Sequence, residues 1–116
     1  MILDKYLETL QEEFVPSVAK ASVAGSYNED WTRCYTTRCE RLTDDLEIKE
    51  CKLQCYIDAA TRAIAELNRL KGECRDSNNP DSCIETLDKA IERYNKKITS
   101  SRQAQTEVRA KITAQR

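Results

Sequence analysis

Apolar residues recur at helical spacing along most of the chain. Between about residues 45 and 75 the apolar positions step by three and four: Leu53, Tyr56, Ala60, Ala63, Leu67, Leu70 and Cys74. From about residue 80 a second seam has the same period: Ile84, Leu87, Ile91, Tyr94, Ile98, Ser101, Gln105, Val108 and Ile112. Such seams are typical of helices that pack as a coiled coil. Because a short loop joins them, they predict a long antiparallel helical hairpin over residues 45–116.

Two shorter helical segments are predicted before this hairpin. An apolar stripe indicates a helix over about residues 3–15, and a continuation rich in small residues follows Pro16 and ends at Gly25. A linker is expected at residues 25–28, where Asn28 would cap the next segment, which ends near residues 41–43. We therefore expect about four helices in a single domain, residues 1–116. It divides into an N-terminal segment (1–25), a cysteine hairpin (28–58) and the long hairpin (45–116).

Helix caps are readable at the starts of the two long helices. Asp44 with Glu47 three residues later resembles a capping box. Asn79 precedes Pro80, and proline is favoured at the first helical position because its missing N–H would be unpaired there anyway. These signals place helix starts near residues 45 and 80.

The six cysteines are placed as mirror images about two predicted turns. Cys74 and Cys83 flank the breaker run 76–81, and Cys34 and Cys39 face Cys51 and Cys55 across a short polar stretch. If each turn joins two antiparallel helices, this symmetry predicts three bridges: Cys34–Cys55, Cys39–Cys51 and Cys74–Cys83. Six cysteines allow 15 pairings, so other connectivities stay open.

The spacing of Cys34 and Cys39 needs a local change in the helix. Residues five apart lie about 140° around a regular helix and do not share a face. Either the segment ends before Cys39, or a one-residue bulge realigns it. A zinc site built from Cys34, Cys39, Cys51 and Cys55 is the rival interpretation, although structural zinc sites mostly place their cysteines in loops.

Composition favours an elongated all-α protein. Charged residues make up 34% of the chain, with only two glycines and two prolines. Nineteen basic residues against twenty acidic ones argue against a nucleic-acid binder. No run approaches the eighteen apolar residues of a membrane span. We expect antiparallel helical hairpins stapled by disulfides, in which Trp31, Tyr35 and Tyr56 form a small core near the nested bridges.

Six paired cysteines imply an oxidising compartment. The start of the chain lacks a basic region followed by an uninterrupted apolar stretch, so we expect no secretory signal. A mature secreted or periplasmic chain, a virion protein and a protein of the mitochondrial intermembrane space stay open. A reduced cytosolic protein with free thiols is the remaining alternative.

The pattern Cys34-x4-Cys39-x11-Cys51-x3-Cys55 resembles the twin C-x3-C motif of the small Tim chaperones and related α-hairpin proteins of the mitochondrial intermembrane space. Tyr35, Glu50 and Tyr56 also fit that motif. The resemblance covers about 22 of the 116 residues. It implies a helical hairpin with an inner and an outer bridge. The first spacing of four, the additional pair Cys74/Cys83 and the long flanking helices depart from the family.

Catalysis has little support, because histidine is absent and no glycine-rich phosphate loop occurs. We expect no enzymatic activity, cofactor, metal or small-molecule substrate. The expected function is that of a structural, accessory or assembly subunit that binds other protein subunits, in a respiratory-chain or inner-membrane assembly facing the intermembrane space. A small-Tim-like chaperone for hydrophobic precursors and a secreted, periplasmic or virion scaffold are the alternatives.

The expected partner-binding segment is the C-terminal end of the last helix. Ser101 and Gln105 interrupt the apolar seam, as a register-setting polar layer or as a partner-facing surface. Beyond them the predicted partner contacts are Val108 and Ile112 as apolar anchors, with Arg102 and Arg109 for an acidic neighbour. We expect residues 100–116 to fray in the isolated protein and to become ordered on another subunit.

Overall fold

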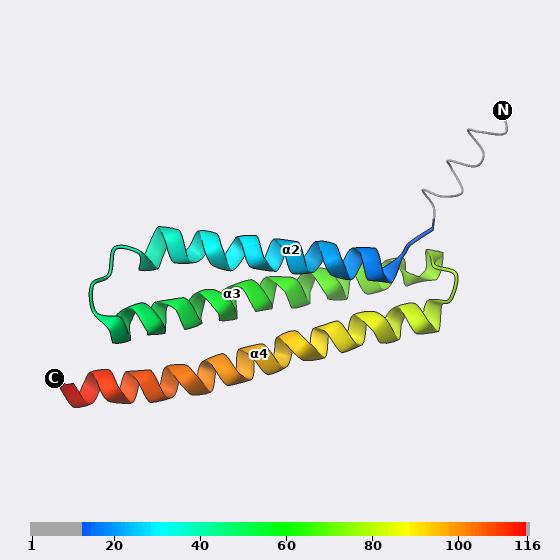
Figure 1. The fold of residues 1–116 in the computed structure, drawn as a ribbon. Coiled ribbons are helices and arrows are strands. Elements are labelled where there is room, and N and C mark those ends of the chain that lie inside the picture. Colours follow the sequence, from blue (N-terminus) through cyan, green and yellow to red (C-terminus); the bar gives the residue numbers. More distant parts are fainter. Residues whose placement is uncertain (1–12, 116) are drawn as a thin grey trace.

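The computed structural model describes residues 13–115, which are helical along most of their length. The elements are α2 (Pro16–Cys34), the π-helix η1 (Tyr35–Cys39), α3 (Asp45–Lys71), the 3-10 helix η2 (Gly72–Asp76) and α4 (Pro80–Gln115). In Figure 1, α3 runs between α2 and α4 and antiparallel to both. The described residues measure 71 × 27 × 14 Å. The expected all-α, elongated and disulfide-stapled architecture is therefore confirmed.

The described chain contains three long helices, so the expectation of about four is wrong. No break occurs at residues 25–28, because α2 continues through them. Gly25 has an ordinary helical φ and costs about 1 kcal/mol relative to alanine. That cost is offset because Val23 is buried and Tyr27 packs against the same core on either side of it. The side chain of Asn28 accepts a hydrogen bond from Trp31 inside the helix instead of capping a new one.

The predicted helix over residues 3–15 lies mostly outside the described residues. Residues 13–15 are not helical. Val15 has extended backbone angles, and α2 begins at Pro16. The backbone N–H of Phe14 donates to the carbonyl of Asp76 over 3.1 Å, which fixes the entry into α2 against η2.

Both predicted caps are present at the starts of the long helices. The Asp44 carboxylate accepts a hydrogen bond from the backbone N–H of Glu47 over 3.0 Å. The side-chain oxygen of Asn79 accepts from the N–H of Ser82 over 3.1 Å, and Pro80 is the first residue of α4. Each cap satisfies one of the N–H groups that a helix start leaves unpaired.

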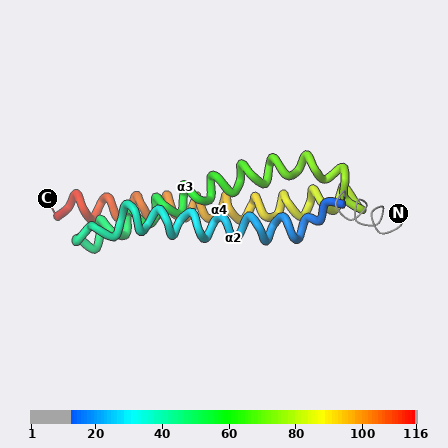
Figure 2. Tube along the Cα trace, turned by 90° about the horizontal axis from the view of Figure 1, so that it is seen from above, coloured from blue at the N-terminus to red at the C-terminus, as the bar shows by residue number. Residues whose placement is uncertain are grey.

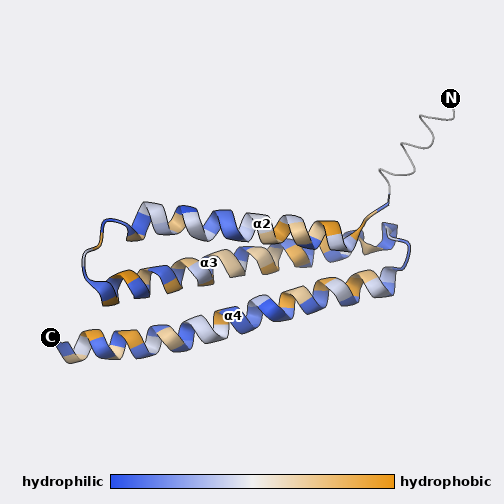
Figure 3. Cartoon of the chain, viewed as in Figure 1, coloured by the Kyte–Doolittle hydropathy of each residue, from blue (hydrophilic) through white to orange (hydrophobic). Residues whose placement is uncertain are grey.

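The end of the rod at residues 72–80, called the turn end, contains an apolar core. Its buried members are Val23, Ala63, Leu67, Leu70, Cys74, Cys83, Leu87 and Ala90. Leu67 and Leu87 are fully buried. Toward this end α3 rises out of the plane of α2 and α4, so the helices form a triangle around the core (Figure 2). The first half of α2, which faces this core, is also its more hydrophobic half (Figure 3).

The opposite end, at residues 35–45, is called the bridge end and is flatter and more polar. There α4 continues along α3, and Ser101, Gln105 and Val108 are all buried. The amide of Gln105 donates to the side-chain oxygen of Gln54 over 3.0 Å, across the two helices. In this half of α4 the predicted seam is therefore buried against α3. Near the start of α4, Ile84 departs from the predicted seam: it is 38% exposed, and Cys83 takes the inward position.

None of the helices in the described part of the chain is long and apolar enough to cross a membrane.

Candidate partner-binding face and disulfide frame

Three disulfides tie the helices together. The structure pairs Cys34 with Cys55, Cys39 with Cys51 and Cys74 with Cys83, which are the pairs that the mirror-image spacing predicts. The paired Cα atoms lie 5.6, 5.7 and 5.5 Å apart, within the usual range for a bridge. The first two bridges join the C-terminal end of α2 and η1 to α3. The third closes the turn between α3 and α4.

The π-helix η1 solves the spacing problem between Cys34 and Cys39. The N–H of Glu40 donates to the carbonyl of Tyr35 five residues earlier, over 3.1 Å. This wider turn holds one more residue than an α-helical turn. It brings Cys34 and Cys39 onto the side that faces α3, as the predicted one-residue bulge requires.

The alternative of a zinc site does not fit this arrangement. The sulfurs of Cys39, Cys51 and Cys55 lie within 4.8 Å of one another. Each of them is bonded to another sulfur, whereas zinc binds deprotonated thiolates. In the structure these cysteines form the frame of the hairpin.

Five aromatic side chains gather in the middle of the rod, on a surface to which all three helices contribute. They are Tyr27 and Trp31 of α2, Tyr35 of η1, Tyr56 of α3 and Tyr94 of α4, and all are half-buried. The ring centroids of Trp31 and Tyr56 lie 5.0 Å apart, and those of Tyr27 and Tyr94 lie 5.3 Å apart. Together with Lys52 and Lys97, these residues are called the aromatic–lysine face.

The two lysines lie over the rings of this face. The Lys97 ammonium is 4.6 Å from the centroid of Tyr56. The Lys52 ammonium is 5.8–5.9 Å from the centroids of Trp31, Tyr35 and Tyr56. Such contacts stabilise a cation by about 0.5–1 kcal/mol at exposed sites. Neither lysine makes an ion pair with an acidic residue of the described chain, in contrast to the neighbouring Lys96, which pairs with Glu92.

A hollow of about 380 Å³ between α2 and α4 adjoins the aromatic–lysine face. Tyr27, Tyr94, Lys20, Arg93 and Lys97 are among the residues that line it. Lys20 and Arg93 also have no acidic partner among the described residues. The hollow therefore has an apolar floor with basic groups around it.

The Tyr27 hydroxyl is buried beside this hollow without a hydrogen-bond partner among the described residues. Burial raises the pKa of Tyr27 from 10.0 to about 12, and the neighbouring phenols of Tyr56 and Tyr94 add to the rise. Burial also raises the pKa of Tyr94. Both phenols are therefore neutral near pH 7. The charged residues that line the hollow in the described part of the chain, Lys20, Arg93 and Lys97, are all positive.

The residues of the predicted C-terminal partner segment differ in how far they are exposed. Val108 is 2% exposed, so the expectation that it is an uncovered anchor is wrong. The physical reason is that α4 lies against the N-terminal half of α3, which covers it. Arg109 donates to Glu50 of α3 over 2.6 Å. Ile112 is half-buried and Arg102 is exposed. Residues 100–115 belong to α4 of this chain, and the buried Ser101 and Gln105 form a polar layer facing α3.

Sequence reasoning placed Trp31, Tyr35 and Tyr56 in a small core near the nested bridges, and none of them is fully buried. It missed the face because the expected linker at residues 25–28 separated Tyr27 from the other aromatics of α2. With α2 continuous, Tyr27, Trp31 and Tyr35 follow one another at four-residue spacing. That spacing is the signal that could have revealed the face.

No family model, no curated protein and no solved structure matches this chain. The resemblance to the small Tim proteins therefore rests on the sequence motif at residues 34–56 alone.

Proposed function

We propose that this protein is a non-enzymatic accessory or assembly subunit that binds another protein across the aromatic–lysine face. The observation that supports this is the combination of five half-buried aromatic rings with cations that lack acidic partners in the described chain. Aromatic side chains are enriched in protein interfaces. Positive groups at an interface are matched by negative groups of the partner. A rigid, disulfide-stapled rod would hold such a face in a fixed orientation.

The partner that fits the face is an acidic amphipathic helix. The hollow between α2 and α4 runs with the helices, and a fourth helix placed there would complete a bundle. Its apolar side would cover Tyr27 and Tyr94. Its carboxylates would meet Lys20, Arg93 and Lys97, which charge complementarity favours.

The compartment that we propose is the mitochondrial intermembrane space. The supporting observations are three disulfides in the described chain and the twin cysteine pattern at residues 34–55. Within that compartment, a respiratory-chain or inner-membrane assembly is the proposed setting. A secreted, periplasmic or virion scaffold would share the same disulfide frame, so a localisation experiment has to separate them.

A chaperone for hydrophobic precursors has less support from the described surface. The large apolar side chains that are exposed there are Val15, Val18 and Ile84, which lie near the first turns of α2 and α4. They offer no continuous apolar groove for varied clients. The aromatic–lysine face, with its fixed pattern of charges, suits a specific partner better.

A peptide titration tests the proposed face. Trp31 is the only tryptophan of the chain, so its fluorescence reports on the face directly. A synthetic amphipathic helix of leucine and glutamate should change the Trp31 emission on binding, and a matched leucine–lysine helix should not. Lys97→Glu should weaken binding of the acidic peptide by about tenfold, which is 1.4 kcal/mol. Lys96→Glu is the matched control, because Lys96 already pairs with Glu92.

Other results would overturn the proposed partner. Equal binding of both peptides, or equal effects of the two lysine substitutions, would contradict a face selective for acidic helices. Tighter binding after removal of residues 1–12 would identify the chain's own N-terminal segment as the occupant. Dimers that Lys97→Glu dissociates would identify a second copy.

Import into isolated mitochondria tests the compartment. We expect the labelled chain to be protected from added protease until the outer membrane is ruptured, with all six cysteines oxidised inside. Failure to enter mitochondria, together with uptake into endoplasmic-reticulum vesicles, would favour the secreted alternative.

A further inference from the structure

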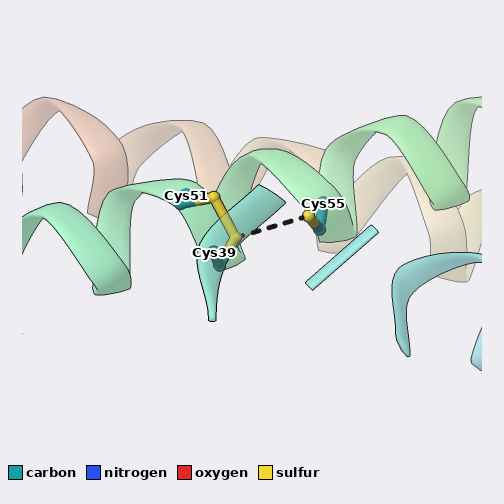
Figure 4. A group of neighbouring side chains, drawn as sticks. All are labelled: Cys39, Cys51 and Cys55. Carbon is teal, nitrogen blue, oxygen red and sulfur yellow. Dashed lines mark hydrogen bonds between the residues drawn. A yellow bond between two sulfur atoms is a disulfide. The ribbon is translucent and has the colours of Figure 1, made fainter. Parts of the chain in front are cut away.

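The two nested bridges lie in direct contact with each other. The sulfur of Cys39 is 3.8 Å from the sulfur of Cys55, although each belongs to a different disulfide. Figure 4 shows Cys39 with its bond to Cys51 on one side and the contact to Cys55 marked by the dashed line on the other. Neither sulfur carries a hydrogen while both bridges are closed. The contact is therefore a sulfur–sulfur approach between two bonds.

Access from solvent differs between the two halves of each bridge. Cys39 is fully buried and Cys55 is 1% exposed, whereas Cys51 and Cys34 are half-buried. Cys51 lines a hollow of about 370 Å³ on the α4 side of α3. Cys34 lines a second hollow of about 190 Å³ on the α2 side. Arg38 and Cys55 line both hollows, so a reagent can approach the outer sulfur of either bridge through one of two neighbouring openings.

We propose that this four-cysteine cluster is a thiol–disulfide exchange site, in which reduction that begins at Cys51 moves the remaining bridge to the buried pair Cys39–Cys55 and releases Cys34. An incoming thiolate attacks Cys51, forms a mixed disulfide with it and releases Cys39 as a thiolate. Cys39 attacks the adjacent Cys55 sulfur, so that a Cys39–Cys55 bond forms and Cys34 leaves as a thiolate. A second thiol then attacks the mixed disulfide, which releases Cys51 as a thiolate and the oxidised reagent.

The electrons and bonds balance in this sequence. Two thiols of the reductant become one disulfide, and the protein goes from two nested bridges to the single bridge Cys39–Cys55 with Cys34 and Cys51 as thiols. The reductant belongs to the class of small thiols or protein dithiols. Exchange through an attacking thiolate and a mixed disulfide is the general route of such reactions.

The first step depends on access to Cys51, which lines an open hollow of mixed charge. Arg38 and Arg109 line this hollow together with Glu47 and Glu50. The Glu50 carboxylate accepts the hydrogen bond of Arg109. Arg38 lies 3.6 Å from Asp58, an exposed pair that is held weakly. In the bridge Cys74–Cys83 both residues are 1% exposed, although Cys83 lines a hollow of about 240 Å³.

The consequence is a partly reduced state in which the hairpin keeps one covalent link. The new bridge joins η1 to α3 through the two buried sulfurs. The two outer thiols line neighbouring hollows, so reduction that begins at Cys51 releases a thiolate at Cys34. This chemistry is independent of the proposed partner, because none of the four cysteines belongs to the aromatic–lysine face.

Partial reduction with glutathione tests the exchange. The reaction is stopped by acid, free thiols are alkylated, and the species with two free thiols is mapped by peptide mass spectrometry. We expect alkylated Cys34 and Cys51 and an intact Cys39–Cys55 bridge in the main species. A main species with alkylated Cys39 and Cys51 and an intact Cys34–Cys55 bridge would show that the two bridges react independently.

A variant provides a second readout that does not depend on the reduction rate. Cys51→Ser leaves Cys39 without its partner and beside Cys55. We expect an equilibrium between the bridges Cys34–Cys55 and Cys39–Cys55, with free Cys34 detected in a substantial fraction of molecules. Exclusive retention of Cys34–Cys55, in a variant whose circular dichroism shows a folded helical protein, would overturn the proposal.

Discussion

At the turn end of the rod three helices surround an apolar core, whereas at the bridge end they lie nearly flat and are joined by covalent bonds. Leu67 and Leu87 are fully buried at the turn end. At the bridge end the helix contacts include a polar pair, the half-buried Gln54 and the buried Gln105, which hydrogen-bond over 3.0 Å. The comparison suggests a division of roles. Apolar burial stabilises the turn end. At the bridge end disulfides take the place of an apolar core, so the aromatic side chains stay half-buried instead of packing inside one.

The largest expected effect comes from removing both nested bridges. Replacing Cys34, Cys39, Cys51 and Cys55 with alanine should lower the free energy of unfolding by roughly 5 kcal/mol, because two loops of about ten to twenty residues are no longer closed in the unfolded chain. The matched control removes Cys74 and Cys83 and should cost roughly 2.7 kcal/mol. Urea denaturation measures both.

Amide hydrogen exchange along the chain sharpens this comparison of the two ends. In the variant without nested bridges, residues 26–34 should lose amide protection before the turn end does, because their half of α2 contributes little to the apolar core. Uniform loss of protection along the rod would show that the two ends are not separately stabilised.

The next effect concerns the apolar core itself. Leu67→Ala should cost about 2–5 kcal/mol, because a fully buried leucine leaves a cavity. Val108→Ala at the bridge end should cost about 1.5 kcal/mol, since two buried methyl groups are lost. Thermal or urea unfolding checks the pair. An equal cost at both positions would mean that the bridge end has a core as tight as the turn end.

A smaller effect is expected from the polar layer. Gln105→Ala should cost about 1–3 kcal/mol, because it leaves the side-chain oxygen of the half-buried Gln54 without its hydrogen-bond donor. Replacing both glutamines with leucine should restore the stability or raise it, since the layer then becomes apolar. If the double leucine variant also loses its single antiparallel pairing, the layer fixes the register of α3 and α4.

The smallest effect is a dependence on alkaline pH at the aromatic–lysine face. The pKa of Tyr27 is raised from 10.0 to about 12, so its phenol ionises more readily in the unfolded chain than in the folded one. The contribution to stability is complete below pH 10 and is lost as the pH rises toward 12. Urea unfolding at several pH values measures the loss. Tyr27→Phe should reduce it, and an unchanged slope would place the titration elsewhere.

Much of the frame was predictable from the sequence because it depends on local signals. The mirror-image cysteines, the caps at Asp44 and Asn79 and the seams of the long helices all survive in the structure. Helix geometry alone required either an end of the helix before Cys39 or a one-residue bulge, and the structure has the bulge. These features depend on the spacing of residues along one or two helices, and this spacing can be read directly from the sequence.

The remaining features depend on tertiary contacts that spacing does not encode. Gly25 was read as a stop, but packing of Val23 and Tyr27 on the core carries α2 through it. Val108 is predicted to be an apolar anchor for a partner, but the antiparallel course of α4 places it against α3. The aromatic–lysine face could not be predicted from spacing either, because it combines side chains from all three helices and requires a continuous α2.

Footprinting of the free and the assembled protein tests the proposed partner face most directly. Hydroxyl-radical oxidation of Trp31, Tyr35 and Tyr56 is measured together with amide exchange of residues 100–115. We predict that assembly with the partner protects the three aromatic side chains, while residues 100–115 are equally protected in both states. Unchanged oxidation of the aromatics, with protection gained only at residues 100–115, would contradict the proposed face and return the partner site to the end of α4.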